Sequence, residues 1–229
     1  MNLPNAVTAG RIAFTPLLAW LPLAPSSSLR LTAFVLFLIA AITDYVDGQL
    51  ARSRKQETDL GRLLDPLADK LLLVATCIPM FLLMRPVAHE TYSWPLKALN
   101  GELPFRTPFG DVPLTWWVLA VVLGRELFMT LFRQIAARRG VVIAAIGPAK
   151  WKTALQLVWI GCAYCWFWTA TLAATHGWDN VLWHVFANFN GLAGVAAMTG
   201  SVALTLYSLG LYLRSYRRVF IGAPVRGQG

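Results

Sequence analysis

The chain has 229 residues, of which 57% are hydrophobic and only 14% charged, and its mean hydropathy is +0.55. Soluble domains carry about 25% charged residues, so this composition excludes a fold covered by a water-facing surface. The formal net charge of +9 suits the anionic headgroups of an inner membrane leaflet, so we expect no nucleic-acid partner.

Six apolar stretches approach the roughly 20 residues that a membrane-spanning helix needs. In chain order they are 3–24, 31–52, 62–84, 114–137, 149–174 and 190–213. Nothing long remains for a soluble domain, so residues 1–229 are expected to form a single all-α integral membrane domain. The first stretch is similar in length to a secretory signal. Its only cation, Arg11, interrupts the stretch instead of preceding it, so we expect an uncleaved helix.

Lysine and arginine are distributed unequally between the two sides of this arrangement. One side holds both termini and the loops 53–61 and 138–148. Together with the adjacent helix ends it carries fifteen Lys and Arg residues, against four in the opposite loops. Because positive residues accumulate on the cytoplasmic side, the sequence predicts that both termini are cytoplasmic.

The stretch "TDYVDGQLARSRKQETDLGRLLDPLADK", from Thr43 to Lys70, holds six of the chain's eleven acidic residues between two apolar runs. At 100° per residue, Asp44 and Asp47 share one helical face, and Asp65 and Asp69 share another. The eight residues between Arg52 and Gly61 are polar and predict a cytoplasmic turn. In an antiparallel hairpin the four carboxylates would meet just inside the cytoplasmic interface. Pro66 would kink the second helix or mark its first turn.

Four neighbouring carboxylates repel one another and need cations to stay ionised. Oxygen ligands of this kind favour Mg²⁺ or Mn²⁺ over zinc, and paired ions of this type assist displacement at phosphorus. The small residues Gly48 and Ala51 would let a nucleotide or pyrophosphate approach the backbone. The alternative is a set of interfacial acids that cap helices and pair with nearby arginines. That alternative explains Glu57 and Asp59, but it does not explain four aspartates on facing stripes in costly apolar surroundings.

These residues resemble the signature of the CDP-alcohol phosphatidyltransferase family. The matching pattern is Asp44-x-x-Asp47-Gly48-x-x-Ala51-Arg52, eight residues, then Gly61-x-x-x-Asp65-x-x-x-Asp69. The resemblance implies six helices with cytoplasmic termini, and transfer of a phosphatidyl group from CDP-diacylglycerol to an alcohol with release of CMP. It also implies that the four aspartates hold two divalent cations and that Asp69 deprotonates the attacking hydroxyl. CDP-diacylglycerol would be bound by Asp44, Asp47, Gly48, Ala51, Arg52, Gly61 and Asp65.

A second set of residues is a candidate site for the phosphate of the acceptor: Arg125, Arg133, Lys150 and Lys152. Basic residues at the end of a span usually anchor its topology, which accounts for Arg138 and Arg139. Arg125 lies near the middle of an apolar run, so it must be paired or bind an anion. The surrounding segments resemble those of the family branch that uses sn-glycerol 3-phosphate.

The expected protein is therefore an enzyme of a bacterial cytoplasmic membrane, with its active site facing the cytoplasm. The resemblance implies a homodimer, and the small residues of "GLAGVAAMTGS" (Gly191–Ser201) would permit close helix packing. Inositol phosphate, serine and phosphatidylglycerol remain alternative acceptors. A divalent-cation channel or transporter is the alternative of another class. Against it, the outer parts "LTAFVLFLI" and "CIPMFLLM" of the second and third spans lack ionisable residues.

Overall fold

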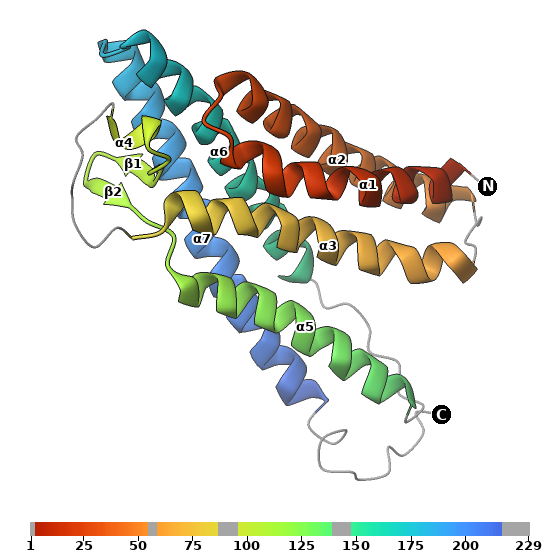
Figure 1. Ribbon diagram of the computed structural model, residues 1–229. Coiled ribbons are helices and arrows are strands. Elements are labelled where there is room, and N and C mark those ends of the chain that lie inside the picture. Colours follow the sequence, from red (N-terminus) through yellow and green to blue (C-terminus); the bar gives the residue numbers. More distant parts are fainter. Residues whose placement is uncertain (1–2, 55–58, 87–95, 139–147, 217–229) are drawn as a thin grey trace. The chain divides into compact units, whose positions relative to one another are not determined.

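The computed structural model describes the backbone of residues 3–54, 59–86, 96–138 and 148–216, and side chains within 9–43, 67–86, 97–138 and 151–216. The long helices are α1 (Leu3–Trp20), α2 (Ser27–Arg54), α3 (Asp59–Met84), α5 (Trp116–Arg138), α6 (Pro148–His176) and α7 (Val181–Ser215) (Figure 1). The shorter elements are η1 (Leu21–Leu23), α4 (Leu96–Leu99), β1 (Phe105–Thr107) and β2 (Gly110–Val112). Each of the six apolar stretches predicted from the sequence coincides with one long helix.

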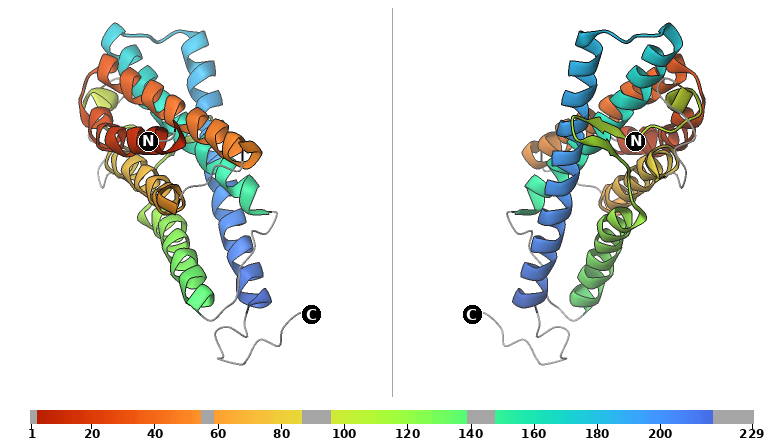
Figure 2. Two further views of the ribbon diagram at one scale, coloured as in Figure 1. Left: turned by 90° about the vertical axis from the view of Figure 1, so that its right-hand side faces the viewer. Right: turned by 90° about the vertical axis from the view of Figure 1, so that its left-hand side faces the viewer.

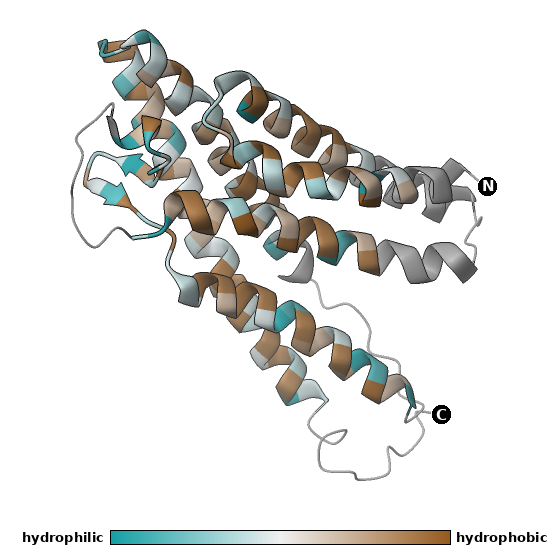
Figure 3. Cartoon of the chain, viewed as in Figure 1, coloured by the Kyte–Doolittle hydropathy of each residue, from teal (hydrophilic) through white to brown (hydrophobic). Residues whose placement is uncertain are grey.

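Among the described residues, three helices are long and apolar enough to cross a membrane, at Leu67–Met84, Trp151–His176 and Val181–Ser215. The apolar parts of α1 and α2 are shorter, at Ala9–Leu23 and Ser27–Thr43. Figure 3 shows hydrophobic residues along each of the long helices. The protein is therefore mostly helical, with helices suited to a bilayer. The number of spans and the side on which the termini lie stay predictions.

The ends of α6 and α7 follow from local sequence. Pro148 begins α6, where its missing N–H costs no helical hydrogen bond. At the other end of α6, Gly177 has a positive φ of 64°, and the backbone N–H of Trp178 donates to the carbonyl of Ala173 at 2.9 Å. This is a glycine-terminated helix end. Asn180 then caps α7, because its Oδ1 accepts from the backbone N–H of Trp183 at 2.8 Å.

The chain divides into two compact units. The first comprises Met1–Thr115 and Leu157–Val195, and the second comprises Trp116–Gln156 and Ala196–Gly229. In the first unit α1 packs against both α2 and α3, and the three helices lie side by side (Figure 1). Tyr164 of α6 is buried in this unit and donates to the backbone carbonyl of Leu18 at 2.8 Å.

A buried arginine joins three elements of the first unit. Arg30, at the start of α2, is only 1% exposed. Its Nε donates to the carbonyl of Pro22 at 2.9 Å, and its Nη1 donates to Thr171 Oγ1 on α6. Because hydrogen bonds from a charged group stabilise by about 1.5–3 kcal/mol each, Arg30 fastens η1 and α6 to α2.

The β1–β2 hairpin corrects the all-α expectation. It lies within the loop 85–113, pairs Phe105 with Val112, and packs on α7 (Figure 2). A Cβ on Gly191 would come within 1.8 Å of the Arg106 carbonyl oxygen, and one on Gly194 within 2.4 Å of the Phe105 ring. The hairpin of the same chain therefore packs closely against α7 at these two glycines. The small-residue stripe no longer argues for a contact between subunits, and a homodimer stays a prediction from the family resemblance.

Candidate active site

The signature aspartates lie on two long helices, as the sequence predicts. Asp44 and Asp47 belong to α2, whereas Asp65 and Asp69 belong to α3. Both helices extend further into the polar segment than expected, since α2 ends at Arg54 and α3 begins at Asp59. The predicted eight-residue turn is therefore shortened from both ends, and its central residues 55–58 lie outside the described part.

Pro66 lies well inside α3 and does not mark its first turn. Spacings of three and four residues on continuous helices place each aspartate pair on one face. Seven residues are predicted to bind CDP-diacylglycerol, and the structure describes only the backbone at all of them: Asp44, Asp47, Gly48, Ala51, Arg52, Gly61 and Asp65.

Asp69 has a described side chain, and its partner comes from α1. Arg11 Nη1 donates to Asp69 Oδ1 at 3.1 Å, with the Arg11 side chain 5% exposed and that of Asp69 58% exposed. The backbone carbonyl of Arg11 also accepts from Thr15 Oγ1 at 2.8 Å. α1 thus supplies a buried counter-charge to the last position of the signature.

In the sequence, Arg11 stands out only as the cation that interrupts the first apolar stretch. A lone charge inside an apolar helix needs a partner of opposite charge. By this rule, an acidic partner for Arg11 could have been expected from the sequence.

The second unit contains a buried ionic cluster built by α5 and α6. Arg125 Nη1 donates to Glu126 Oε1 at 3.1 Å, and Lys152 Nζ contacts the same oxygen. The side chains of Arg125 and Lys152 are only 6% and 4% exposed, and that of Glu126 is 26% exposed. Two cations share one carboxylate, so the three side chains carry a net charge of one positive unit.

α7 completes the surroundings of Arg125. Arg125 Nη2 donates to Ser208 Oγ at 3.2 Å, and its guanidinium carbon lies 5.9 Å from the centre of the Tyr212 ring. Such a position over an aromatic face is a cation–π contact. The polar contacts of Arg125 therefore come from its own helix and from α7.

Two of the four predicted acceptor-site residues meet in this cluster, Arg125 and Lys152. Arg133 is exposed on α5, and Lys150 has its side chain outside the described part. In the sequence, Glu126 is simply the residue next to Arg125. Nothing in the sequence indicates that Glu126 would be the carboxylate that Arg125 and Lys152 share, because sequence spacing relates residues on one helix and not across two.

Several donors around this cluster have no hydrogen-bond partner among the described residues. They are Arg125 Nε, Gln156 Nε2 and Thr205 Oγ1, each in a residue no more than 7% exposed. Gln156 lies one helical turn after Lys152, and Thr205 lies one turn before Ser208. A buried unsatisfied polar group costs about 1–3 kcal/mol, so the second unit offers hydrogen-bond donors for which the described residues provide no acceptor.

The sequence model of the CDP-alcohol phosphatidyltransferases matches residues 1–207. The chain belongs to the CDP-alcohol phosphatidyltransferase family.

The relatives of this phosphatidyltransferase chain include enzymes with different names. It is 31% identical over 229 residues to CDP-diacylglycerol–glycerol-3-phosphate 3-phosphatidyltransferase 1, chloroplastic/mitochondrial, of Arabidopsis thaliana, covering 96% of this chain and 64% of that protein. It is 32% identical over 169 residues to the Bacillus subtilis CDP-diacylglycerol–glycerol-3-phosphate 3-phosphatidyltransferase, covering 69% of this chain and 73% of the relative. The CMP-forming cardiolipin synthase of Oryza sativa is 30% identical over 231 residues, covering 96% and 59%. The chain thus spans less than two thirds of the length of these two plant relatives.

Phosphatidyltransferases of this family use divalent metal ions, and the four signature aspartates on α2 and α3 are suitable ligands for such ions. Four aspartates at spacings of three and four residues offer only oxygen ligands, which suit Mg²⁺ or Mn²⁺. Within the described side chains, no three His, Cys, Asp or Glu residues are grouped as a metal site. Of the four aspartates, only Asp69 belongs to that part of the chain.

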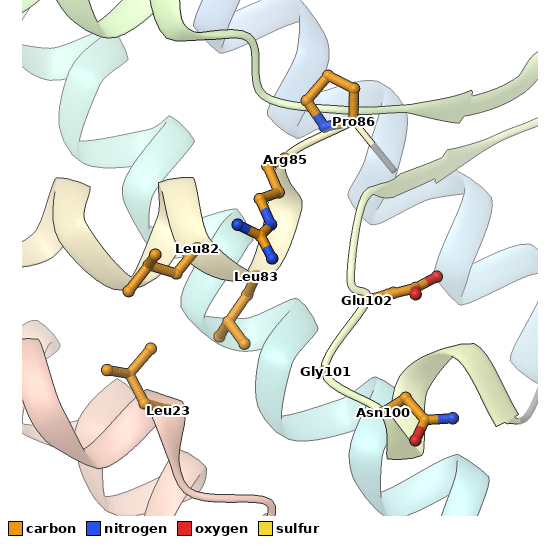
Figure 4. Close-up of a pocket in the computed structure, with 8 residues that line it drawn as sticks. All are labelled: Leu23, Leu82, Leu83, Arg85, Pro86, Asn100, Gly101 and Glu102. Carbon is orange, nitrogen blue, oxygen red and sulfur yellow. The ribbon is translucent and has the colours of Figure 1, made fainter. Parts of the chain in front are cut away.

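A polar pocket of about 470 Å³ lies elsewhere in the first unit (Figure 4). It is formed by η1, the end of α3 and the chain after α4, with Arg85 and Glu102 among its lining residues. Arg85 directly follows α3 and lies 16 positions after Asp69, which amounts to about 24 Å along a helix. This pocket is therefore separate from the phosphatidyltransferase signature.

Proposed function

We propose that this phosphatidyltransferase moves the phosphatidyl group of CDP-diacylglycerol onto sn-glycerol 3-phosphate, giving phosphatidylglycerol phosphate and CMP. The observation that carries the reaction class is the complete signature on α2 and α3, with Asp69 paired to a buried arginine. Two of the relatives described above are named for this reaction.

In the proposed reaction, the acceptor hydroxyl oxygen forms a bond to the phosphorus of the phosphatidyl group. The bond from that phosphorus to the oxygen of CMP breaks, and CMP leaves with the bonding electrons. Asp69 accepts the hydroxyl proton as general base. Asp44, Asp47, Asp65 and Asp69 would hold two divalent cations, which when bound neutralise the pyrophosphate charge. Gly48, Ala51, Arg52 and Gly61 would leave room for and contact the cytidine diphosphate, next to Asp44, Asp47 and Asp65.

The ionic cluster of the second unit supports a phosphorylated acceptor. Its net positive charge suits an anion, and so do the N–H groups of Arg125 and Gln156 that have no hydrogen-bond partner within the described part of the chain. Lys150 and Arg133 would add positive charge near the cytoplasmic ends of α6 and α5. Serine has no phosphate and no net charge, so it complements the positive charge of this cluster less well than a phosphorylated acceptor does.

A panel of acceptors tests the proposed substrate. Purified protein is incubated with CDP-diacylglycerol, a divalent cation and sn-glycerol 3-phosphate, inositol phosphate, serine or phosphatidylglycerol, and CMP release is followed. We expect the highest kcat/KM with sn-glycerol 3-phosphate. Equal or faster turnover with phosphatidylglycerol would instead assign the reaction named for the rice relative.

Arg125→Lys should raise the KM for glycerol 3-phosphate by about one to two decades, because one charge-assisted contact contributes roughly 1.5–3 kcal/mol. Lysine keeps the positive charge opposite Glu126 but loses the planar fork that suits a phosphate. Affinity for CDP-diacylglycerol should change little. Steady-state kinetics with each substrate varied in turn gives both values.

Arg138→Lys serves as the control, since Arg138 is exposed at the end of α5. If Arg125→Lys weakened the binding of CDP-diacylglycerol and of glycerol 3-phosphate equally, the substitution would have damaged the fold in general. That result would remove the phosphate site from the proposal.

We also place the protein in a bacterial cytoplasmic membrane, with both termini and the active site on the cytoplasmic side. The support is the fifteen-to-four distribution of Lys and Arg. In a variant without native cysteines, a membrane-impermeant thiol reagent applied to intact cells should label Pro108→Cys in the hairpin turn and leave Arg138→Cys unlabelled. The reverse pattern would invert the proposed orientation.

A further inference from the structure

An apolar groove of about 420 Å³ lies between α1 and α2 in the first unit. Its lining residues are Gly10, Arg11, Phe14, Leu18, Leu36, Ile39, Ala40 and Thr43. Phe14 on α1 and Ile39 on α2 are 52% and 55% exposed, so the groove is open at the surface of the unit. The volume lies within the range of about 300–1,000 Å³ that is typical of ligand sites.

One end of the groove meets the catalytic signature. Arg11 lines the groove and also holds Asp69 at 3.1 Å. On the opposite wall, Thr43 directly precedes Asp44. From Arg11 the groove extends along α1 to Leu18, about 10 Å further into apolar sequence.

The charge and the lining of the groove restrict its occupant. The length between Arg11 and Leu18 offers hydrocarbon walls, so it accepts an apolar chain. The Arg11 end carries a guanidinium whose Nη1 donates to Asp69, and a guanidinium has five N–H donors, so it can bind a phosphate oxygen as well as this carboxylate. A molecule that satisfies both ends has an acyl chain and a phosphate, and a phospholipid has both.

We propose that this groove receives one acyl chain of the lipid donor, with the donor's phosphate end next to Arg11. The inference rests on the proposed function, because it identifies the lipid as CDP-diacylglycerol. The groove then orients the donor so that its pyrophosphate lies at the signature helices, and the length of the acyl chain becomes a determinant of turnover. A bystander phospholipid of the bilayer is the competing occupant.

Gly10→Leu tests the groove directly. A Cβ at Gly10 would meet no atom within 4 Å, so the backbone position tolerates a side chain, and Gly10 lines the groove that a leucine there would narrow. Gly210→Leu on α7 is the matched control, since Gly210 is exposed, has equally open space and does not line the groove. Ala40→Leu fills the groove from the α2 side, and it replaces Gly10→Leu in the experiment if Gly10→Leu does not fold.

Two donors are compared, dioleoyl and dibutyryl CDP-diacylglycerol, of which only the first has chains long enough to fill the groove. In Gly10→Leu the ratio of kcat/KM for the long-chain donor to that for the short-chain donor should fall about tenfold, the scale of an overpacked apolar site. The control should keep the wild-type ratio. Equal losses for both donors, or an unchanged ratio in both groove variants, would overturn the proposal.

Binding without turnover separates this inference from the proposed function. The equilibrium affinity of wild type and Gly10→Leu for each donor is measured in detergent, with dioleoyl phosphatidylcholine as competitor. We expect Gly10→Leu to weaken binding of the long-chain donor alone. That result in a protein that releases no CMP would refute the transferase reaction and retain the groove. Equal competition by phosphatidylcholine would assign the groove to bystander lipid and refute the inference.

Discussion

Asp69→Asn should lower kcat by about 10²–10⁴-fold, the usual effect of a lost general base. Asparagine keeps the shape of the side chain, and its carbonyl oxygen can still accept from Arg11 Nη1, which lies 3.1 Å from Asp69 Oδ1. It cannot accept the proton of the attacking hydroxyl. Binding of CDP-diacylglycerol should therefore be retained much better than turnover. Single-turnover CMP release and equilibrium donor binding measure the two effects separately.

Asp111→Asn is the matched control for this substitution. Asp111 lies in the β1–β2 hairpin, and its carboxylate is also paired to a cation, Lys97, at 3.1 Å. We expect normal turnover in this variant. If Asp69→Asn also turns over at a near-normal rate, another group is the base, and the role assigned to Asp69 is wrong.

Asp44→Asn and Asp65→Asn should weaken the binding of both metal and donor along with the rate. Each removes a carboxylate that the proposal places directly on a cation. The loss in Mn²⁺ affinity should therefore exceed the roughly 10–100-fold typical of substitutions in the outer shell of a metal site. Mn²⁺ binding by equilibrium dialysis, with CDP-diacylglycerol affinity measured in parallel, distinguishes these variants from Asp69→Asn. If all three variants bound Mn²⁺ as the wild type does, the four aspartates would be interfacial acids and the metal-site proposal would fail.

The helices could be predicted from the sequence because their signal is local. Apolar runs near the length of a bilayer coincide with α1, α2, α3, α5, α6 and α7. The boundaries of α2 and α3 were less accurate, because Arg54 and Asp59 are polar and read as turn residues although both are helical. Polar residues at the end of a helix look the same in sequence as polar residues in a loop.

The contacts between separate helices and strands could not be predicted from the sequence. The glycines Gly191 and Gly194 indicate a close approach, but they do not say whether a helix or a hairpin approaches. Likewise, the pairing of Arg11 with Asp69 joins residues 58 positions apart. Spacing rules relate neighbours on one helix, whereas these contacts depend on how separate elements pack.

Glu126 shows the same limit at the candidate acceptor site. The sequence predicted that Arg125 must be paired or bind an anion, and the structure shows pairing with Glu126 and Ser208. It also leaves Arg125 Nε without an acceptor among the described residues. The predicted need for an anion is thus met only in part by the protein, and the phosphate of the acceptor is proposed for the remainder.

Transfer of label from glycerol 3-phosphate to lipid tests the central claim most directly. Purified protein in vesicles containing CDP-diacylglycerol receives labelled sn-glycerol 3-phosphate and Mg²⁺ or Mn²⁺, and the lipid extract and the released CMP are counted together. The account predicts equal amounts of labelled lipid and CMP, both abolished by chelating the divalent cation and both lowered in Asp69→Asn. CMP release without labelled lipid would contradict the proposed acceptor. Passage of the divalent cation across the vesicle membrane with neither product would identify a transporter and contradict the account as a whole.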